Sequence, residues 1–392
     1  MKKSYPLALS SWDQKEISAI HGVIETAQYS MGPQVFEYEK QFAAHFGSKY
    51  CVMTSSGSTA NLIMTAALFY RKENPLKRGD VVIVPAVSWS TTFFPLAQYG
   101  LKLRFVDVDP QTLNYDLKSL GEALCDRPRL MMVVNLLGNP NDFDAILEMA
   151  KNSGTEVVED NCESMGARFR GKHAGTFGTM GTFSSFFSHH ISTMEGGCIL
   201  TDNEEYHHLL LCLRAHGWTR NLPKHNHITG TKSEDPFEES FKFVLPGYNV
   251  RPLEMSGAIG LEQLKKLDKF VEVRRKNAEL FVKTFAEHSQ LRIQEEIGHS
   301  SWFGFSMIIR EDSSWSRKKL TQYLQSRGVE CRPIVTGNFA KNPVMSLFEH
   351  ELQNSLPNAH WLDSNGFFVG NHQIPLTEEI QYLAEVLRDF AS

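Results

Sequence analysis

The sequence predicts an α/β protein: a mainly parallel sheet with helices on its faces, followed by a smaller α+β domain. Three observations lead to this prediction. Through roughly the first two hundred residues, short apolar runs of strand length alternate with stretches of helical periodicity, which is typical of parallel strands joined by crossover helices. Later in the chain this alternation gives way to longer helical stretches. The length of 392 residues also favours two cores over one.

Seven strands are predicted in the first part of the chain. Five are apolar runs of buried-strand length, at residues 50–54, 81–84, 103–106, 131–134 and 155–159, and two more are expected around residues 181–187 and 198–201. We therefore predict a large α/β domain over residues 1–250, with a helical segment at its N-terminus.

The second part of the chain predicts a smaller α+β domain over residues 251–392. Its expected elements are a long helical stretch at 253–288, a strand at 303–309, a helix at 315–327, a strand at 329–333 and a closing helix at 377–390. No Gly/Ser/Pro-rich linker precedes it, so the two domains are expected to pack against each other.

Charge and composition exclude several classes of function. The 40 Lys+Arg nearly balance the 45 Asp+Glu, for a formal charge of -5 without a basic run, so nonspecific nucleic-acid binding is not expected, whereas small anionic ligands stay open. No apolar stretch reaches transmembrane length. The six cysteines are scattered, with no C-x-x-C spacing, so we expect reduced thiols and no metal site. A cytoplasmic protein with no membrane partner is predicted.

A small-residue turn follows the first strand. Residues 55–61 read SSGSTAN and precede a helical pattern. Backbone N–H groups at the positive end of such a helix can converge on an anion, so Gly57 and Ser58 are candidates for binding a phosphate. The alternative is that the serines only cap the helix.

Acidic residues end the fifth strand. Asp160 and Glu163 lie in the run VVEDNCE at residues 157–163, at the carboxyl edge where open α/β sheets bind ligands. A carboxylate at this edge can hold a protonated ring nitrogen. The alternative is a solvent-facing strand end or a cap for the next helix.

The most informative segment is GTFSSFFSHHISTMEGG at residues 181–197. It resembles the sugar aminotransferases and dehydratases that depend on pyridoxal phosphate and share the aspartate-aminotransferase fold, fold type I. In most members, a lysine that binds the cofactor covalently lies six residues before the Glu of Glu-Gly-Gly. Here that position is His189, and no lysine occurs between Lys172 and Lys224.

A lysine-to-histidine exchange marks the nucleotide-sugar 3-dehydratase branch of this family, and three further stretches extend the resemblance over nearly the whole chain: residues 213–221, 245–252 and 330–339. The resemblance implies a lyase-type enzyme with a mixed, mostly parallel seven-stranded sheet. Its substrates would be glutamate and GDP-4-keto-6-deoxy-D-mannose. Glutamate would convert pyridoxal phosphate to pyridoxamine phosphate, and the 3-hydroxyl would leave the sugar. The products would be 2-oxoglutarate, ammonia and GDP-4-keto-3,6-dideoxymannose, a precursor of O-antigen sugars such as colitose in lipopolysaccharide.

The resemblance also implies the site residues. His189 would be the catalytic base and acid, because imidazole titrates near neutrality, and its neighbour His190 is expected to be structural. The cofactor-binding residues would be Gly57, Ser58 and Ser184 at the phosphate, Trp89 stacked on the ring, Asp160 at the pyridinium nitrogen, Glu163 where aminotransferases commonly carry Gln, and Asn249 from a second subunit. The last role implies a homodimer with shared active sites. Candidates for substrate binding are His216, Arg220, Arg251 and Arg332.

Three alternatives stay open. The chain could be a nucleotide-sugar aminotransferase that recruits a lysine from elsewhere. A histidine-bearing CDP-sugar dehydrase is another relative, but the dispersed cysteines give little support for its iron–sulfur centre. A catalytically silent binding relative is the third, since fold alone does not determine function.

Overall fold

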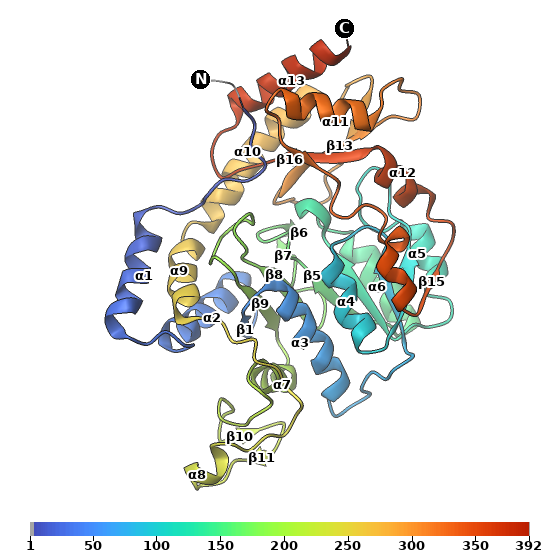
Figure 1. Ribbon diagram of the computed structural model, residues 1–392. Helices are drawn as coiled ribbons and strands as arrows, with labels where there is room; N and C mark the ends of the chain where they lie inside the picture. Colours follow the sequence, from blue (N-terminus) through green and yellow to red (C-terminus); the bar gives the residue numbers. More distant parts are fainter. Residues whose placement is uncertain (1–3, 392) are drawn as a thin grey trace.

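The computed structural model describes residues 4–391 and is built around an eight-stranded sheet (Figure 1). The strand order is β1-β9-β8-β5-β4-β2-β3-β15. Only β9 runs antiparallel to its neighbours in this sheet. The bounds are β1 (Tyr50–Thr54), β2 (Val81–Pro85), β3 (Lys102–Val106), β4 (Leu130–Val134), β5 (Glu156–Asp160), β8 (Gly181–Ser184), β9 (Gly197–Thr201) and β15 (His350–Leu352).

Helices cover both faces of this sheet because its strands are apolar on both sides. Val82 and Val84 of β2 pack with the helices α3 (Gly57–Tyr70), α4 (Ser90–Gln98) and α7 (Glu204–Arg214), whereas Ile83 packs on the opposite face. That face is covered by α5 (Leu117–Ala123) and α6 (Phe143–Ser153), and beside β1 and β9 by α2 (Pro33–Phe46). Continuous apolar runs are the expected signature of such doubly covered strands.

The seven predicted strands of the large sheet are confirmed, and the C-terminal half contributes an eighth, β15. The sequence did not reveal β15 because its three residues, His-Glu-Leu, are short and polar. Tertiary contacts hold it: it pairs in parallel with β3, and Glu351 forms ion pairs with Arg104 and Lys102 on that strand.

A second sheet lies in the C-terminal half, with the order β12-β13-β16-β14 and antiparallel pairing throughout. Its strands are β12 (Leu291–Ile293), β13 (Gly304–Ile309), β16 (Gly366–Gly370) and β14 (Cys331–Arg332). Buried residues of α10 (Leu267–Phe285), α11 (Arg317–Ser326) and α13 (Thr377–Ala391) pack with this sheet in a separate core. The division of the chain at residue 251 stays a prediction, because β15 joins the first sheet while the other C-terminal strands form the second.

The N-terminal segment and the stretch predicted as one long helix at 253–288 meet at the side of the large sheet (Figure 1). That stretch is two helices, α9 (Glu254–Leu264) and α10, with Lys265 and Lys266 between them. Helix α9 packs against α1 (Gln14–Thr26) and α2. Lys266 forms ion pairs with Asp13 and Glu16 at the start of α1.

The remaining elements are short or peripheral: the helices α8 (Pro236–Glu239) and α12 (Pro357–Asn365), the strand pair β6 (Arg168–Phe169) and β7 (Lys172–His173), and the strand pair β10 (His225–Asn226) and β11 (Gly230–Thr231). The pair β10–β11 and α8 belong to an excursion between α7 and α9 that projects from the body of the molecule (Figure 1). Within residues 4–391, no helix is both long and apolar enough to cross a membrane.

Stability is expected to fall in mild acid. Burial lowers the pKa of His173 to about 3 and the pKa values of His189, His207 and His372 to about 4, whereas unfolded histidines titrate near pH 6.5. The unfolded chain therefore binds more protons than the folded chain between about pH 6.5 and pH 4. The thermal unfolding midpoint should fall from pH 7 to pH 5, and less steeply in the His372→Gln variant. A midpoint that stays constant over this range would contradict the burial of these rings in neutral form.

Candidate active site

The turn after β1 brings its backbone close to Ser184 at the end of β8. Ser56 caps α3 by accepting a hydrogen bond from the Thr59 amide (3.1 Å), and Thr59 Oγ1 accepts one from the Ser56 amide (3.0 Å). A Cβ on Gly57 would lie 2.6 Å from the Cβ of Ser184, so only glycine fits there. The amides of Gly57 and Ser58 have no acceptor within the helix because they belong to its first turn. Ser56 can therefore cap α3 while the amides of Gly57 and Ser58 stay available for an anion. Ser184 lies next to Gly57, so its hydroxyl is available for the same anion.

Asp160 ends β5 and is 5% exposed. Its Oδ2 accepts hydrogen bonds from Asn61 Nδ2 (2.9 Å) on α3 and Thr92 Oγ1 (2.7 Å) on α4, and its Oδ1 accepts one from the Cys162 amide (3.1 Å). A carboxylate offers about four acceptor positions, so one remains. No ion pair involves Asp160 among residues 4–391, and a buried carboxylate in this state fits a cationic ring nitrogen.

Glu163 follows Asp160 by three residues. Its Oε2 accepts a hydrogen bond from the Leu137 amide (3.1 Å). Burial raises the pKa of Glu163 to about 7, and the charge of Asp160 adds to the rise while the Leu137 amide opposes it. This carboxyl can therefore carry or release a proton near neutral pH, which the glutamine common at this place in the family could not do.

His189 lies in the loop between β8 and β9. Strand β8 ends at Ser184, earlier than predicted, so His189 is in a turn whose amide donates to Phe186 O (2.9 Å). Its ring makes edge contacts with Phe303 (5.2 Å between centroids) and Phe186 (6.0 Å). Its Nδ1 is buried without a hydrogen-bond partner among the described residues.

The surroundings of His189 change its expected titration. Burial, and secondarily the charge of Arg274, lower its pKa to about 4, so the ring is neutral at physiological pH and not half-protonated near neutrality as the sequence suggested. A neutral imidazole is in the form that accepts a proton. His190 is fully buried with Nε2 at 3.1 Å from Ser301 O, which agrees with a structural role for the second histidine.

Trp89 immediately precedes α4 at the carboxyl end of β2 and is 56% exposed. It is therefore not a core tryptophan, which was the alternative to ring stacking. The segment after β14 reaches the same place, because Thr336 Oγ1 donates to Ser88 O (2.5 Å). Arg332 is the last residue of β14, just before this segment, and is exposed.

Three of the four predicted substrate-binding residues gather around Trp218. The Arg220 guanidinium lies 4.1 Å and the Arg251 guanidinium 5.4 Å from its ring centroid, and the His216 ring lies 5.1 Å away. Arg251 also contacts His216 Nε2 (3.5 Å). Trp218 was missed from the sequence, although it lies between His216 and Arg220 in a stretch that carries the resemblance. Exposed Phe241 extends this group, 5.5 Å from Arg220.

Asn249 is exposed at the end of the same excursion and accepts a hydrogen bond from Arg251 Nε (3.0 Å). The next residue, Val250, accepts one from the Ser55 amide (2.9 Å), so Asn249 lies close to the turn after β1 of its own chain. Its reach into a second subunit stays a prediction.

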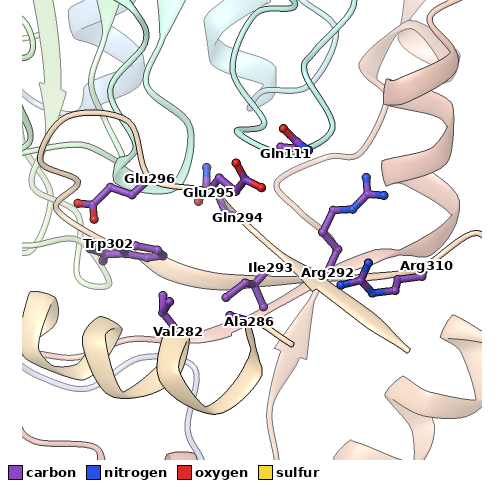
Figure 2. A pocket seen from close by; sticks show the side chains of 10 residues that line it. All are labelled: Gln111, Val282, Ala286, Arg292, Ile293, Gln294, Glu295, Glu296, Trp302 and Arg310. Atoms are coloured by element: carbon purple, nitrogen blue, oxygen red, sulfur yellow. The ribbon is translucent and has the colours of Figure 1, made fainter. Parts of the chain in front are cut away.

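A separate cavity of about 440 Å³ opens beside β12 (Figure 2). Its lining residues are Gln111, Val282, Ala286, Arg292, Ile293, Gln294, Glu295, Glu296, Trp302 and Arg310. None of the predicted site residues lines it, so the cavity and the candidate active site are different places.

No group of three His, Cys, Asp or Glu side chains suited to a metal ion occurs in the part of the chain that the structure describes.

Comparison with known proteins identifies the family of the chain. The profile of the DegT/DnrJ/EryC1/StrS aminotransferase family matches residues 10–388. The chain is 62% identical over 386 residues to the GDP-4-keto-6-deoxy-D-mannose 3-dehydratase of Escherichia coli O55:H7, covering 98% of this chain and 100% of the relative.

Two solved structures of a GDP-4-keto-6-deoxymannose-3-dehydratase are similar throughout. Each is 62% identical, covers 98% of this chain and 100% of the other, and has a TM-score of 0.97. One is a histidine-to-asparagine mutant with bound GDP-perosamine, and the other contains a trapped geminal diamine of pyridoxal phosphate and glutamate.

The chain belongs to the DegT/DnrJ/EryC1/StrS aminotransferase family. The predicted fold class, the fold of the pyridoxal-phosphate-dependent aminotransferases, is thereby confirmed.

Removing the Asp160 charge should weaken cofactor binding. Asp160→Asn keeps the size of the side chain but removes the charge that would pair with the ring nitrogen, and we expect at least about a tenfold loss in affinity for pyridoxal phosphate, or about 1.4 kcal/mol. Absorbance titration of the purified chain measures this. Asp107→Asn is the matched control, because Asp107 is equally buried beyond the end of β3 and binds backbone amides outside the site. Equal affinity in the two variants would contradict the assigned role.

The neutral state of His189 can be measured directly. We expect its ring signals in NMR spectra of the chain without added cofactor, assigned by comparison with His189→Asn, to show no protonation between pH 7.5 and pH 5. Burial places its pKa at about 4. A midpoint near pH 6.5 for His189 would show that water reaches the ring.

Proposed function

We propose that this chain removes the 3-hydroxyl group of GDP-4-keto-6-deoxy-D-mannose in a reaction that depends on pyridoxal phosphate and uses glutamate as amino donor. The products are GDP-4-keto-3,6-dideoxymannose, 2-oxoglutarate and ammonia. One observation carries this proposal: His189 stands where the family motif has lysine, and its Nδ1 is buried without a hydrogen-bond partner among the described residues. Relatives at 62% identity bear the name of this activity.

When bound, the cofactor would supply the amine that carries the amino group of glutamate to the ketone carbon next to the departing hydroxyl, and its electron-withdrawing ring would acidify the cofactor carbon that gives up a proton. Asp160 holds the ring nitrogen in its protonated state, which makes the ring a stronger electron acceptor. Gly57, Ser58 and Ser184 hold the phosphate at the positive end of α3. Trp89 covers one face of the ring.

His189 moves the protons. In its neutral form it accepts a proton from the methylene carbon of the cofactor. In its protonated form it gives a proton to the departing hydroxyl of the sugar. A histidine cannot bind the cofactor covalently as lysine does. It therefore cannot displace the sugar from the cofactor, which is the step that would release an amino sugar. Glu163, three residues after Asp160, has a pKa of about 7 and can hold a proton at the cofactor oxygen.

The group around Trp218 is assigned to the nucleotide part of the substrate. Arg220, Arg251 and His216 supply donors and positive charge for a diphosphate, and guanidinium groups suit such oxygens. Arg332, which is exposed on β14, is assigned to a carboxylate or phosphate. GDP-perosamine in a solved relative supports a GDP-sugar as the ligand class.

The active form is proposed to be a homodimer in which Asn249 of each chain reaches the phosphate site of the other. Support comes from its exposure at the end of the excursion that carries Trp218. The cytoplasmic location expected from the sequence stays a prediction.

The decisive experiment incubates the purified chain with pyridoxal phosphate, glutamate and GDP-4-keto-6-deoxy-D-mannose. Ammonia and 2-oxoglutarate should appear in equal amounts, and His189→Asn should abolish both sugar dehydration and ammonia release while cofactor binding persists. His350→Asn, at an exposed histidine on β15, is the control and should keep full turnover.

The alternatives give different products. An amino sugar formed without ammonia would identify an aminotransferase, and a borohydride-stable link between cofactor and protein would show a recruited lysine. No reaction in the presence of bound cofactor would identify a silent relative.

A further inference from the structure

The loop that carries His189 is closed at its base by its own residues. The Ser185 amide donates to Gly196 O (2.9 Å), the Thr193 amide donates to Ser185 O (2.9 Å), and the two hydroxyl groups of Ser185 and Thr193 lie 2.6 Å apart. These bonds fix where the loop leaves and rejoins the sheet. They do not fix residues 186–192 between them, where His189 lies.

That middle part is held from outside at two residues: His190, whose Nε2 lies 3.1 Å from Ser301 O, and Ser192. The Ser192 amide donates to Gln263 Oε1 (2.9 Å), and the Ser192 carbonyl accepts from Trp12 Nε1 (2.9 Å). Both polar groups of one peptide residue are thus bound by side chains from distant parts of the chain, three residues after His189. The Gln263 side chain belongs to α9, and Trp12 immediately precedes the cap of α1.

Gln263 uses its full hydrogen-bonding capacity. Besides the Ser192 amide, its Oε1 accepts from Ser11 Oγ (2.7 Å), and its Nε2 donates to Ser11 O (3.1 Å) and Glu16 Oε1 (2.8 Å). A primary amide can accept two and donate two, and all four bonds are made in a residue with 0% exposure. The arrangement also determines the orientation of the amide, since only the oxygen can accept from Ser192.

The N-terminal arm is itself anchored. Lys266 donates to both carboxylate oxygens of Glu16 (2.6 and 2.8 Å) and pairs with Asp13 (3.0 Å). Burial alone would raise the pKa of Glu16, but the hydrogen bonds from Lys266 and Gln263 outweigh it and lower the pKa. Glu16 therefore remains a carboxylate that binds Gln263 at neutral pH.

We infer that Gln263 and Trp12 are positioning residues for His189: together they clamp Ser192 and so fix the place of the catalytic ring. This inference rests on the proposed function of His189. The ring of His189 makes edge contacts with Phe303 and Phe186, and its buried Nδ1 has no hydrogen-bond partner among residues 4–391. Its orientation therefore depends on the backbone of its loop, and proton transfer requires a reach of about 2.6–3.2 Å.

The test compares Gln263→Leu and Trp12→Phe with the wild-type protein in the cofactor-bound state. Each variant should lower kcat for dehydration at least about tenfold, because a displacement of about 1 Å at a reacting group can cost a hundredfold. The KM for the GDP-sugar and the affinity for pyridoxal phosphate should stay within about twofold. Peptides covering residues 186–194 should exchange amide hydrogen faster in both variants, with or without added cofactor.

Gln373→Leu is the matched control. Gln373 Nε2 donates to Ser10 O (2.7 Å), so this variant also removes a glutamine that holds the N-terminal arm, but within residues 4–391 no hydrogen bond joins Gln373 to the loop of His189. It should keep both the wild-type kcat and the wild-type exchange of residues 186–194.

The inference would be overturned if Trp12→Phe or Gln263→Leu kept the wild-type kcat while its amide exchange became faster or its unfolding temperature fell. The contacts at Ser192 would then contribute to stability and not to catalysis. Equal losses of kcat and cofactor affinity would also overturn it, as a sign of general disruption. If Gln263→Leu does not fold, Trp12→Phe decides, because it removes one donor and keeps an aromatic ring. If wild-type protein does not dehydrate the sugar, the proposed function fails, and the exchange rates still report whether the clamp holds the loop.

Discussion

The rest of the site depends on one buried carboxylate, Asp160. A charge in the interior is tolerated only when hydrogen bonds or an opposite charge compensate it. Three donors from α3, α4 and the turn after β5 compensate Asp160 in part, and none of them carries a positive charge. The bonds from Asn61 and Thr92 also tie two helices to the carboxyl edge of the sheet. The same contacts that bury Asp160 thus place the turn of Gly57 and the start of α4, where Trp89 lies, around a common point.

His189 illustrates how a catalytic side chain is placed when it has no covalent link to its cofactor. Its loop is fixed at the base by Ser185 and Thr193 and held in the middle at His190 and Ser192. Burial keeps the ring neutral, which suits a base, and raises the pKa of Glu163, which suits a group that shares a proton. Low solvent exposure shifts the two groups in opposite directions, as desolvation always favours the uncharged form.

Much of the fold could be predicted because its strands are continuous apolar runs, a local property. Strand β15 could not, because a three-residue polar segment becomes a strand only through its pairing with β3. The break between α9 and α10 was missed for a similar reason: Lys266 continues the local helical pattern, yet its side chain turns to Glu16 and Asp13 at the other end of the chain. Trp218 was passed over because a lone tryptophan in sequence carries no sign of the two guanidinium groups that lie beside it.

By itself, the sequence determined the class of protein, the cofactor and the one unusual residue, His189, since these follow from motifs contiguous along the chain. Only the tertiary structure decided how that residue behaves. Its low pKa comes from burial among Phe303, Phe186 and the charge of Arg274, and its position depends on Trp12 and Gln263, each more than seventy residues away along the chain. Solvation and long-range hydrogen bonding depend on distances in space, which a linear pattern of residues does not contain.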